Sequence, residues 1–291
     1  DEPIGEGRTV VWTAAFQAAW DGLSDRIAGG NGVPLGPPYE EHGRRLNDGR
    51  LAPGTVDPRD LTTVAGPATE ETWSLVDRAS AAGRPATAPA PSDQQLVVFA
   101  RLRAGVRYEV PFWGHDRPVE FGLDQVPVRA YGLKEDAEGE TAHRIRGQAR
   151  IHVPAGADEE SLDEAAVVVL TGSGGARLVV SGRPPRETLR ATWEDVAQVL
   201  SSAPAEEFRF VDHLAIPRVS LVAGRDFDEI VGAPVVGLDP WEFTAYAHQD
   251  VRPTAHERGA EVDAEALLVA VAAPPRRVVL SGPFLLAMRA P

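Results

Sequence analysis

The stretch His256-Glu-Arg-Gly-Ala-Glu-Val-Asp-Ala264 decides how the rest of this sequence is interpreted. Acidic and small apolar residues alternate in its second half, at Glu261, Val262, Asp263, Ala264 and Glu265. Successive side chains of a β-strand point to opposite faces. The alternation therefore predicts a strand with one acidic face and one small apolar face. We expect this segment to be an edge strand that is built into a sheet in the native state, with its acidic face in solvent.

Strand signals surround this stretch. A long apolar run, Gln95 to Val106, is interrupted only by Arg101 and Arg103. The clearest hairpin spans 165–181, where two Val-rich runs flank Thr171-Gly-Ser-Gly-Gly175. A second hairpin is predicted at the C-terminal end, with Pro274-Pro-Arg-Arg277 as its turn and a last strand over 284–288. Residues 144–153 are also predicted to form a strand.

Helical periodicity is confined to a few segments. Residues 9–28 carry one apolar stripe, formed by Trp12, Phe16, Trp20, Leu23 and Ile27. Shorter helices are predicted over 69–82 and 186–201, whereas 31–68 is expected to be mostly connecting loop. Helices scattered among antiparallel strands predict an α+β fold, with the sheets surrounded by helices in a single large domain over 1–291.

Composition excludes several classes of function. The chain has 291 residues, 29 basic and 43 acidic, for a formal charge of −14, and it has no cysteine. Disulfide scaffolds, zinc–thiolate sites and cysteine nucleophiles are therefore excluded. The acidic balance argues against nucleic acid as a partner, and no apolar run is long enough to cross a bilayer. The chain starts at Asp1 and its only methionine is Met288, so we expect either a processed, extracytoplasmic or secreted protein or a sequence that was trimmed at its start.

No motif carries recognisable chemistry. The loop Thr171–Gly175 lacks the Lys and Ser/Thr of a phosphate-binding loop and leads into a strand. His248 and His256 are eight positions apart, which favours ordinary strand positions over a metal site. The acidic run over 158–164 lacks the spacing of a calcium loop and is typical of a solvated surface. We predict no catalytic residue, no metal ligand and no cofactor.

Several collinear stretches resemble the serpins. Leu214-Ala-Ile-Pro-Arg-Val-Ser-Leu221 is similar to the serpin "LPKFSL" strand, and 256–264 is similar to the "EEGTEAAA" hinge. Ser281-Gly-Pro-Phe-Leu-Leu-Ala-Met-Arg289 resembles the terminal "RPFLFLIR" strand. Upstream, 95–112 is similar to the "LVLVNAIYFKGxWxxPF" strand. The resemblance covers about 69–289, leaves 1–68 unaligned, and implies a serpin-like fold.

The departures from the family bear on function. Inhibitory serpins use a long loop that a protease cuts, after which the hinge inserts into a sheet as a new strand. Here only 22 positions separate Glu261 from Pro283, which implies a reduced or absent reactive-centre loop. The hinge-like segment Glu261, Val262, Asp263, Ala264 and Glu265 carries acids where the mechanism needs small, buriable side chains. We therefore expect a non-inhibitory, non-enzymatic serpin-like binding or structural module, whose partner would be a protein.

Two alternatives stay open. In the first, the short hairpin tip over 272–277 is the bait of a serine protease inhibitor. Arg276 or Arg277 would then occupy the specificity pocket of a trypsin-like protease. In the second, the chain is an uncharacterised hydrolase that uses some of its Asp, Glu and His residues. Protease titration separates the first alternative from the binding module, and a pocket with convergent titratable groups would support the second.

Overall fold

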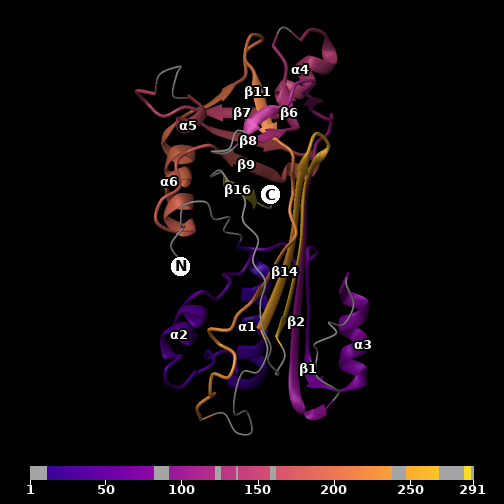
Figure 1. The fold of residues 1–291 in the computed structure, drawn as a ribbon, viewed down its shortest axis with the longest axis vertical. Helices are drawn as coiled ribbons and strands as arrows, with labels where there is room; N and C mark the ends of the chain where they lie inside the picture. The colour runs from indigo at the N-terminus through magenta and orange to yellow at the C-terminus, as the bar shows by residue number, and fades with distance from the viewer. Residues whose placement is uncertain are drawn as a thin grey trace.

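The computed structural model describes residues 12–81, 92–121, 126–135, 137–157, 162–237, 247–268 and 285–289. Long strands run along one half of the molecule, and a smaller sheet with its own helix occupies the other half (Figure 1). Helices and antiparallel strands are mixed throughout, so the predicted α+β class is confirmed. No helix among the described residues is long and apolar enough to cross a membrane.

Within the described ranges, the large sheet has six strands, in the order β1–β2–β15–β14–β12, with β13 also paired to β14. Every neighbouring pair is antiparallel. The strands are β1 (Leu61–Ala68), β2 (Ser92–Arg107), β12 (Val219–Ser220), β13 (Ala223–Asp226), β14 (Ala247–His256) and β15 (Gly259–Leu268).

Two helices cover opposite faces of this sheet (Figure 1). Helix α1 (Ala14–Ala28) packs on the inner face, against Val98, Ala100, Leu102, Val262 and Ala264. Helix α3 (Glu70–Ala79) packs Trp73 and Val76 on the outer face, against Val97 and Phe99. Because neighbouring residues of β2 point to opposite faces, one apolar run serves both helices.

The second sheet has the order β10–β7–β8–β9–β16. Its strands are β7 (Ala149–His152), β8 (Val167–Thr171), β9 (Arg177–Ser181), β10 (Ala205–Glu207) and β16 (Leu285–Arg289). Helix α6 (Leu189–Ser202) covers one face, where Val196 and Val199 meet Val167, Val169 and Val179. The predicted hairpin over 165–181 is present as β8 and β9, which are joined by a 3₁₀ turn at Ser173–Gly175.

Small elements complete the fold. A three-stranded sheet joins β11 (Leu214–Pro217), β6 (Ala130–Leu133) and β3 (Trp113–Gly114), and β4 (Val119–Phe121) pairs with β5 (Val126–Val128). The remaining helices are α2 (Glu40–Asp48), α4 (Glu140–Gly147) and α5 (Leu162–Ala165).

Helix ends follow local chemistry. Thr69 and Thr188 cap α3 and α6 by accepting hydrogen bonds from the backbone N–H of Thr72 and Ala191. Gly29 ends α1 in a left-handed conformation, with φ of 58°. The predicted helices over 9–28, 69–82 and 186–201 are present as α1, α3 and α6.

Two sequence predictions were wrong. Residues 31–68 hold α2 and β1 rather than a continuous loop. Residues 144–147 belong to α4, so the predicted strand over 144–153 is reduced to β7. Ala142 and Ile145 of α4 are both buried, three residues apart. Burial of these two residues on one helical face favours helix through Gly147, so the strand begins only at Ala149.

Candidate functional site

The hinge-like segment lies inside the large sheet. Residues 259–268 form β15, which pairs with β2 from Gly259↔Arg107 to Leu268↔Val98. On its other side, β15 pairs with β14 over the same ten residues. The expectation of an edge strand was therefore wrong, because β15 is flanked on both sides. Residues 269–273, which follow β15, lie outside the described residues, and a hinge role for 261–265 stays a prediction.

The apolar face of β15 is buried along its described length. Val262 and Ala264 pack in the cluster that contains Trp20 of α1, where Ala264 is fully inaccessible. Ala260, nearer the start of the strand, packs instead in the cluster that contains Tyr108. The small side chain of Ala264 allows close approach of the helix to the strand. The inner face of β15 is therefore part of the core of the molecule.

The acidic residues of β15 meet arginines of β2 on the outer face. Asp263 accepts two hydrogen bonds from Arg101, at 2.9 Å from Nε and 2.7 Å from Nη2. The side chains of this pair are only 15% and 22% exposed. Glu261 contacts Arg103 at 3.3 Å, but that pair is more than half exposed. Solvent screening makes the second pair weak, whereas the two-pronged first pair is charge-assisted and partly shielded.

Arg101 also connects the strand to α3. Its Nη1 donates to the carbonyl oxygen of Ala79, at 2.7 Å, in the last turn of the helix. A cation is favourable there because the final carbonyls of a helix lack intrahelical donors. One guanidinium thus contacts α3 and β15 from its place in β2. The expectation that the acidic face lies in solvent was wrong for Asp263.

Hydrogen bonds from the segment after β2 fix the turn between β14 and β15. Tyr108 N–H donates to the carbonyl of Arg258 at 3.1 Å, and Phe112 N–H donates to that of Glu257 at 2.8 Å. The Glu257 carboxylate lies 2.9 Å from Arg218 Nη2. These contacts hold the start of β15 at the end of β2.

Gly259 is required where the chain turns into β15. Its φ is 153°, and a Cβ built on it would lie 2.1 Å from the carbonyl oxygen of Val106. Side chains rarely adopt this backbone conformation, and no side chain fits at that separation. The residue therefore allows β15 to approach β2 closely from its first position.

Two buried tyrosines lie beside this turn. Burial raises the pKa of Tyr131 to about 12 and that of Tyr108 beyond its ordinary range. Both hydroxyls therefore remain protonated at physiological pH. Their oxygens and Glu257 Oε2 have no partner with hydrogen-bond geometry among the described residues. Neither tyrosine is suited to accept or release a proton in catalysis.

His248 lies between two carboxylates. His248 Nδ1 lies 2.6 Å from Asp226 Oδ1, and Nε2 lies 3.3 Å from Asp250 Oδ1. His256 is at the other end of β14, roughly 26 Å away at the usual rise per residue. The two histidines therefore do not share a site. Among the described residues, no group of three or more His, Asp or Glu side chains is arranged to hold a metal ion.

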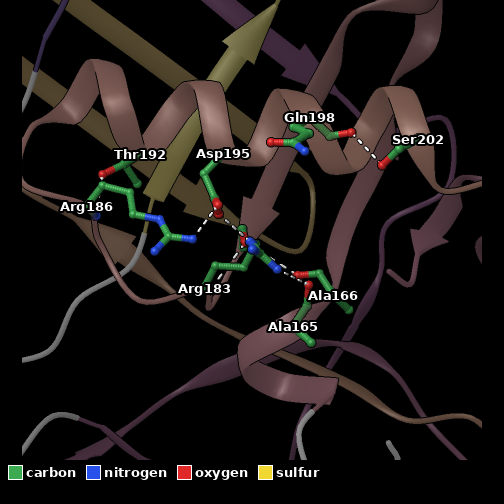
Figure 2. A network of polar contacts seen from close by, with 9 residues as sticks. Ala165, Ala166, Arg183, Arg186, Thr192, Asp195, Gln198 and Ser202 are labelled. Carbon is green, nitrogen blue, oxygen red and sulfur yellow. Dashed lines mark hydrogen bonds and ion pairs between the residues drawn. The ribbon is translucent and has the colours of Figure 1, made fainter. Parts of the chain in front are cut away.

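A second charged network stabilises the smaller sheet. Figure 2 shows Asp195 of α6 between two arginines, with Arg183 Nε at 2.6 Å and Arg186 Nη2 at 2.5 Å. The hydrogen bond from Arg183 lowers the pKa of Asp195, burial opposes it, and Arg186 lowers it further. Arg183 also donates to the carbonyl of Ala165. The network joins α5, the end of β9 and α6, so its role is structural.

Several predicted features lie outside the described residues. Arg276 and Arg277, the proposed bait residues at the tip 272–277, belong to this group, as do 158–161 of the acidic run. Sequence reasoning missed Arg101 and Arg103 as functional partners of the hinge-like segment. Their spacing of two within an apolar run was the available signal, since it matches that of Glu261 and Asp263.

No protein-family model matches this chain, and no curated protein sequence matches it. Solved structures do. The viral serpin CrmA superposes with a TM-score of 0.56 at 12% identity, over 92% of this chain and 96% of that chain. Thyroxine-binding globulin complexed with a thyroxine–fluorescein conjugate gives 0.54 at 12% identity, over 91% and 92%. Ovalbumin from the emu, Dromaius novaehollandiae, gives 0.56 at 8% identity, over 94% and 87%.

These matches extend beyond the sequence resemblance. A coverage of 92% exceeds residues 69–289, so the superposition includes part of the first 68 residues as well. Identities of 8% to 12% establish the fold and nothing finer. The order of strands and helices, and the match over more than nine-tenths of the chain, show that this protein has the serpin fold.

Proposed function

We propose that this protein is a non-inhibitory serpin-like binding or structural module without chemistry of its own, in which β15 belongs to the native sheet. The observation that carries the proposal is the pairing of β15 with both β2 and β14 over ten residues. Serpin inhibition, as the resemblance implies, requires a hinge that enters the sheet only after cleavage. A strand that already occupies this position leaves no insertion to drive the mechanism.

The side chains of β15 support the same proposal. Asp263 would be costly to bury as an unpaired charge, but Arg101 of β2 meets it with two hydrogen bonds. Gly259 fits against Val106 only because it lacks a side chain. The segment is therefore complementary to the sheet at its charged, apolar and backbone positions. Such complementarity is expected of a permanent strand.

Binding is the use of the fold that the described residues favour over catalysis. One solved structure with this fold is thyroxine-binding globulin, complexed with a thyroxine derivative. The acids of β15 near Arg101 and Arg103 are engaged in ion pairs, and no metal-binding group is present among the described residues. These features lend no support to the hydrolase alternative. The partner we propose is a protein or a small ligand.

Limited proteolysis followed by thermal unfolding tests the proposal. The chain is nicked between 269 and 284, and the melting temperatures of nicked and intact protein are compared. We expect no increase on nicking, because β15 is already inserted. A synthetic peptide with the sequence of 259–268 should also fail to anneal to the intact protein. A large gain in melting temperature, or uptake of the peptide, would show that the native sheet is open.

Protease titration tests the inhibitory alternative. A panel of trypsin-like proteases should retain full activity in the presence of excess protein and form no covalent complex. Inhibition that disappears in Arg276→Ala or Arg277→Ala would favour the bait hypothesis instead. The comparison with Arg258→Ala, at the exposed turn before β15, controls for the loss of a surface arginine.

A further inference from the structure

A depression with two arginines lies beside the three-stranded sheet of β11, β6 and β3, near the turn that precedes β15. Its volume is about 540 Å³, and its lining residues are His115, Asp116, Pro118, Pro127, Arg129 and Arg218. Pockets of about 300–1,000 Å³ are typical of sites for small ligands. The depression is therefore large enough for a small organic molecule.

The charges of the lining do not cancel. Asp116 is paired with Lys134 at 3.2 Å, and Arg218 is paired with Glu257 at 2.9 Å. Arg129 is exposed, and its guanidinium makes no hydrogen bond or ion pair with any residue that the structure describes. Counting only the residues that the structure describes, one uncompensated positive charge therefore remains in the depression, on a protein whose formal charge is −14.

Backbone hydrogen bonds place the residues of the lining beside one another. Arg218 N–H donates to the carbonyl of Arg129 at 2.8 Å, so the two arginines leave adjacent strand ends. His115 is fixed by its own N–H, which donates to Ala130 at 3.0 Å, and by Nε2, which donates to the carbonyl of Leu214 at 2.9 Å. Two prolines complete the wall and limit its backbone freedom.

The donors suit an oxyanion. A guanidinium presents five N–H donors in a planar fork that matches carboxylate and phosphate oxygens. Arg218 contacts Glu257 through Nη2, in an ion pair that lacks hydrogen-bond geometry, so its other donors are available. Apolar walls beside these cations, from Pro118 and Pro127, strengthen the local field.

We propose that this depression binds a small organic carboxylate or phosphate, with its oxyanion between Arg129 and Arg218. The site goes beyond the proposed function, because it does not depend on whether β15 inserts before or after cleavage. Arg218 nevertheless connects it to the turn before β15. An anion that recruits Arg218 competes with Glu257 for the same guanidinium.

Calorimetric titration of citrate and of inorganic phosphate, at low ionic strength, tests the site. We expect saturable binding of at least one probe that weakens as salt is added. Citrate binding alone indicates a carboxylate ligand, and phosphate binding alone indicates a phosphate. Arg129→Gln should lower the affinity about tenfold or more, as expected for a lost charge-assisted hydrogen bond. Arg78→Ala, on the exposed side of α3, changes the net charge equally and should bind as the wild type does.

Glu257→Gln provides the opposite arm of the test. Removal of the competing carboxylate frees Arg218, so the affinity for the probe should rise several-fold. Unchanged affinity in this variant would contradict the participation of Arg218. The proposal is overturned if neither probe binds, if Arg129→Gln binds normally, or if Arg78→Ala loses as much affinity as Arg129→Gln. Circular dichroism confirms that each variant is folded, and none of these outcomes bears on the insertion of β15.

Discussion

Arg101 and Asp263 are 162 positions apart in the sequence, yet they form the best-shielded ion pair of the large sheet. Arg103 and Glu261 repeat the arrangement two residues further along, in a more exposed position. An arginine of β2 thus pairs with a carboxylate of β15 twice, once with shielding from solvent and once without it. This difference allows the contribution of burial to be measured within one protein.

A double-mutant cycle on these pairs tests how strongly β15 is held. Arg101→Ala and Asp263→Ala, singly and together, should give a coupling free energy of about 1–2 kcal/mol. The cycle on Arg103 and Glu261 is the matched control and should give about 0.5 kcal/mol or less, because solvent screens it. Urea unfolding measures both. Equal coupling in the two cycles would contradict the role assigned to Asp263.

Gly259 gives a second prediction at the residue scale. Gly259→Ala places a Cβ against the Val106 carbonyl and should lower the free energy of unfolding by about 2 kcal/mol or more. Gly156 also has a positive φ, 86°, but nothing lies near its missing Cβ. Gly156→Ala therefore measures the conformational cost alone, about 1 kcal/mol. Similar losses in both variants would mean that β15 does not approach β2 as described.

At the scale of elements, β13 and β14 are joined by His248. It lies opposite Asp226 of β13 and two residues before Asp250 on its own strand. Burial alone would lower the pKa of His248, but the hydrogen bonds to Asp250 and Asp226 outweigh it and raise the pKa above 6.5. The hydrogen bond to His248 lowers the pKa of Asp250, against burial, and the charge of Arg252 assists.

The stability of this strand pair should therefore depend on pH. A histidine with a raised pKa in the folded state stabilises the fold while protonated, and this contribution is lost as pH rises through that pKa. The contribution of Asp250 is lost when pH falls through its own lowered pKa. We expect His248→Gln to cost more stability at about pH 5.5 than at about pH 9. His143→Gln, on the exposed side of α4, should show no such trend in urea unfolding. A loss independent of pH would contradict the charged pairing.

Strongly periodic elements could be predicted from the sequence. The stripe that includes Phe16 and Trp20 predicted α1, and the Val-rich runs around 171–175 predicted β8 and β9. α2 and β1 were missed because charged residues, glycine and proline hide their short apolar signals. The central position of β15 could not be read from its alternation. The pairing of β15 with β2, which lies far away in the sequence, depends on the packing of the whole sheet. One polar face does not distinguish an edge strand from a central one.

At the scale of the whole molecule, β15 completes the large sheet by pairing with both β2 and β14. The composition does not predict this arrangement, since a formal charge of −14 is compatible with many folds. The candidate site could not be predicted, because the acids of β15 and the arginines of β2 come together only in the folded sheet. The proposed anion site could not be predicted from the sequence either, because Arg129 and Arg218 are distant in sequence and meet only beside the three-stranded sheet of β11, β6 and β3.

Hydrogen exchange of the intact, uncleaved chain tests most directly whether β15 belongs to the sheet before cleavage. Backbone amides of 259–268 should exchange as slowly as those of β2 and β14, because β15 is hydrogen-bonded to both strands. Peptide-level mass spectrometry resolves this segment from its neighbours. Slow exchange over 259–268 in the uncleaved protein is the result that we predict. Rapid exchange there, with protection appearing only after cleavage, would show that β15 inserts on cleavage and would contradict the account.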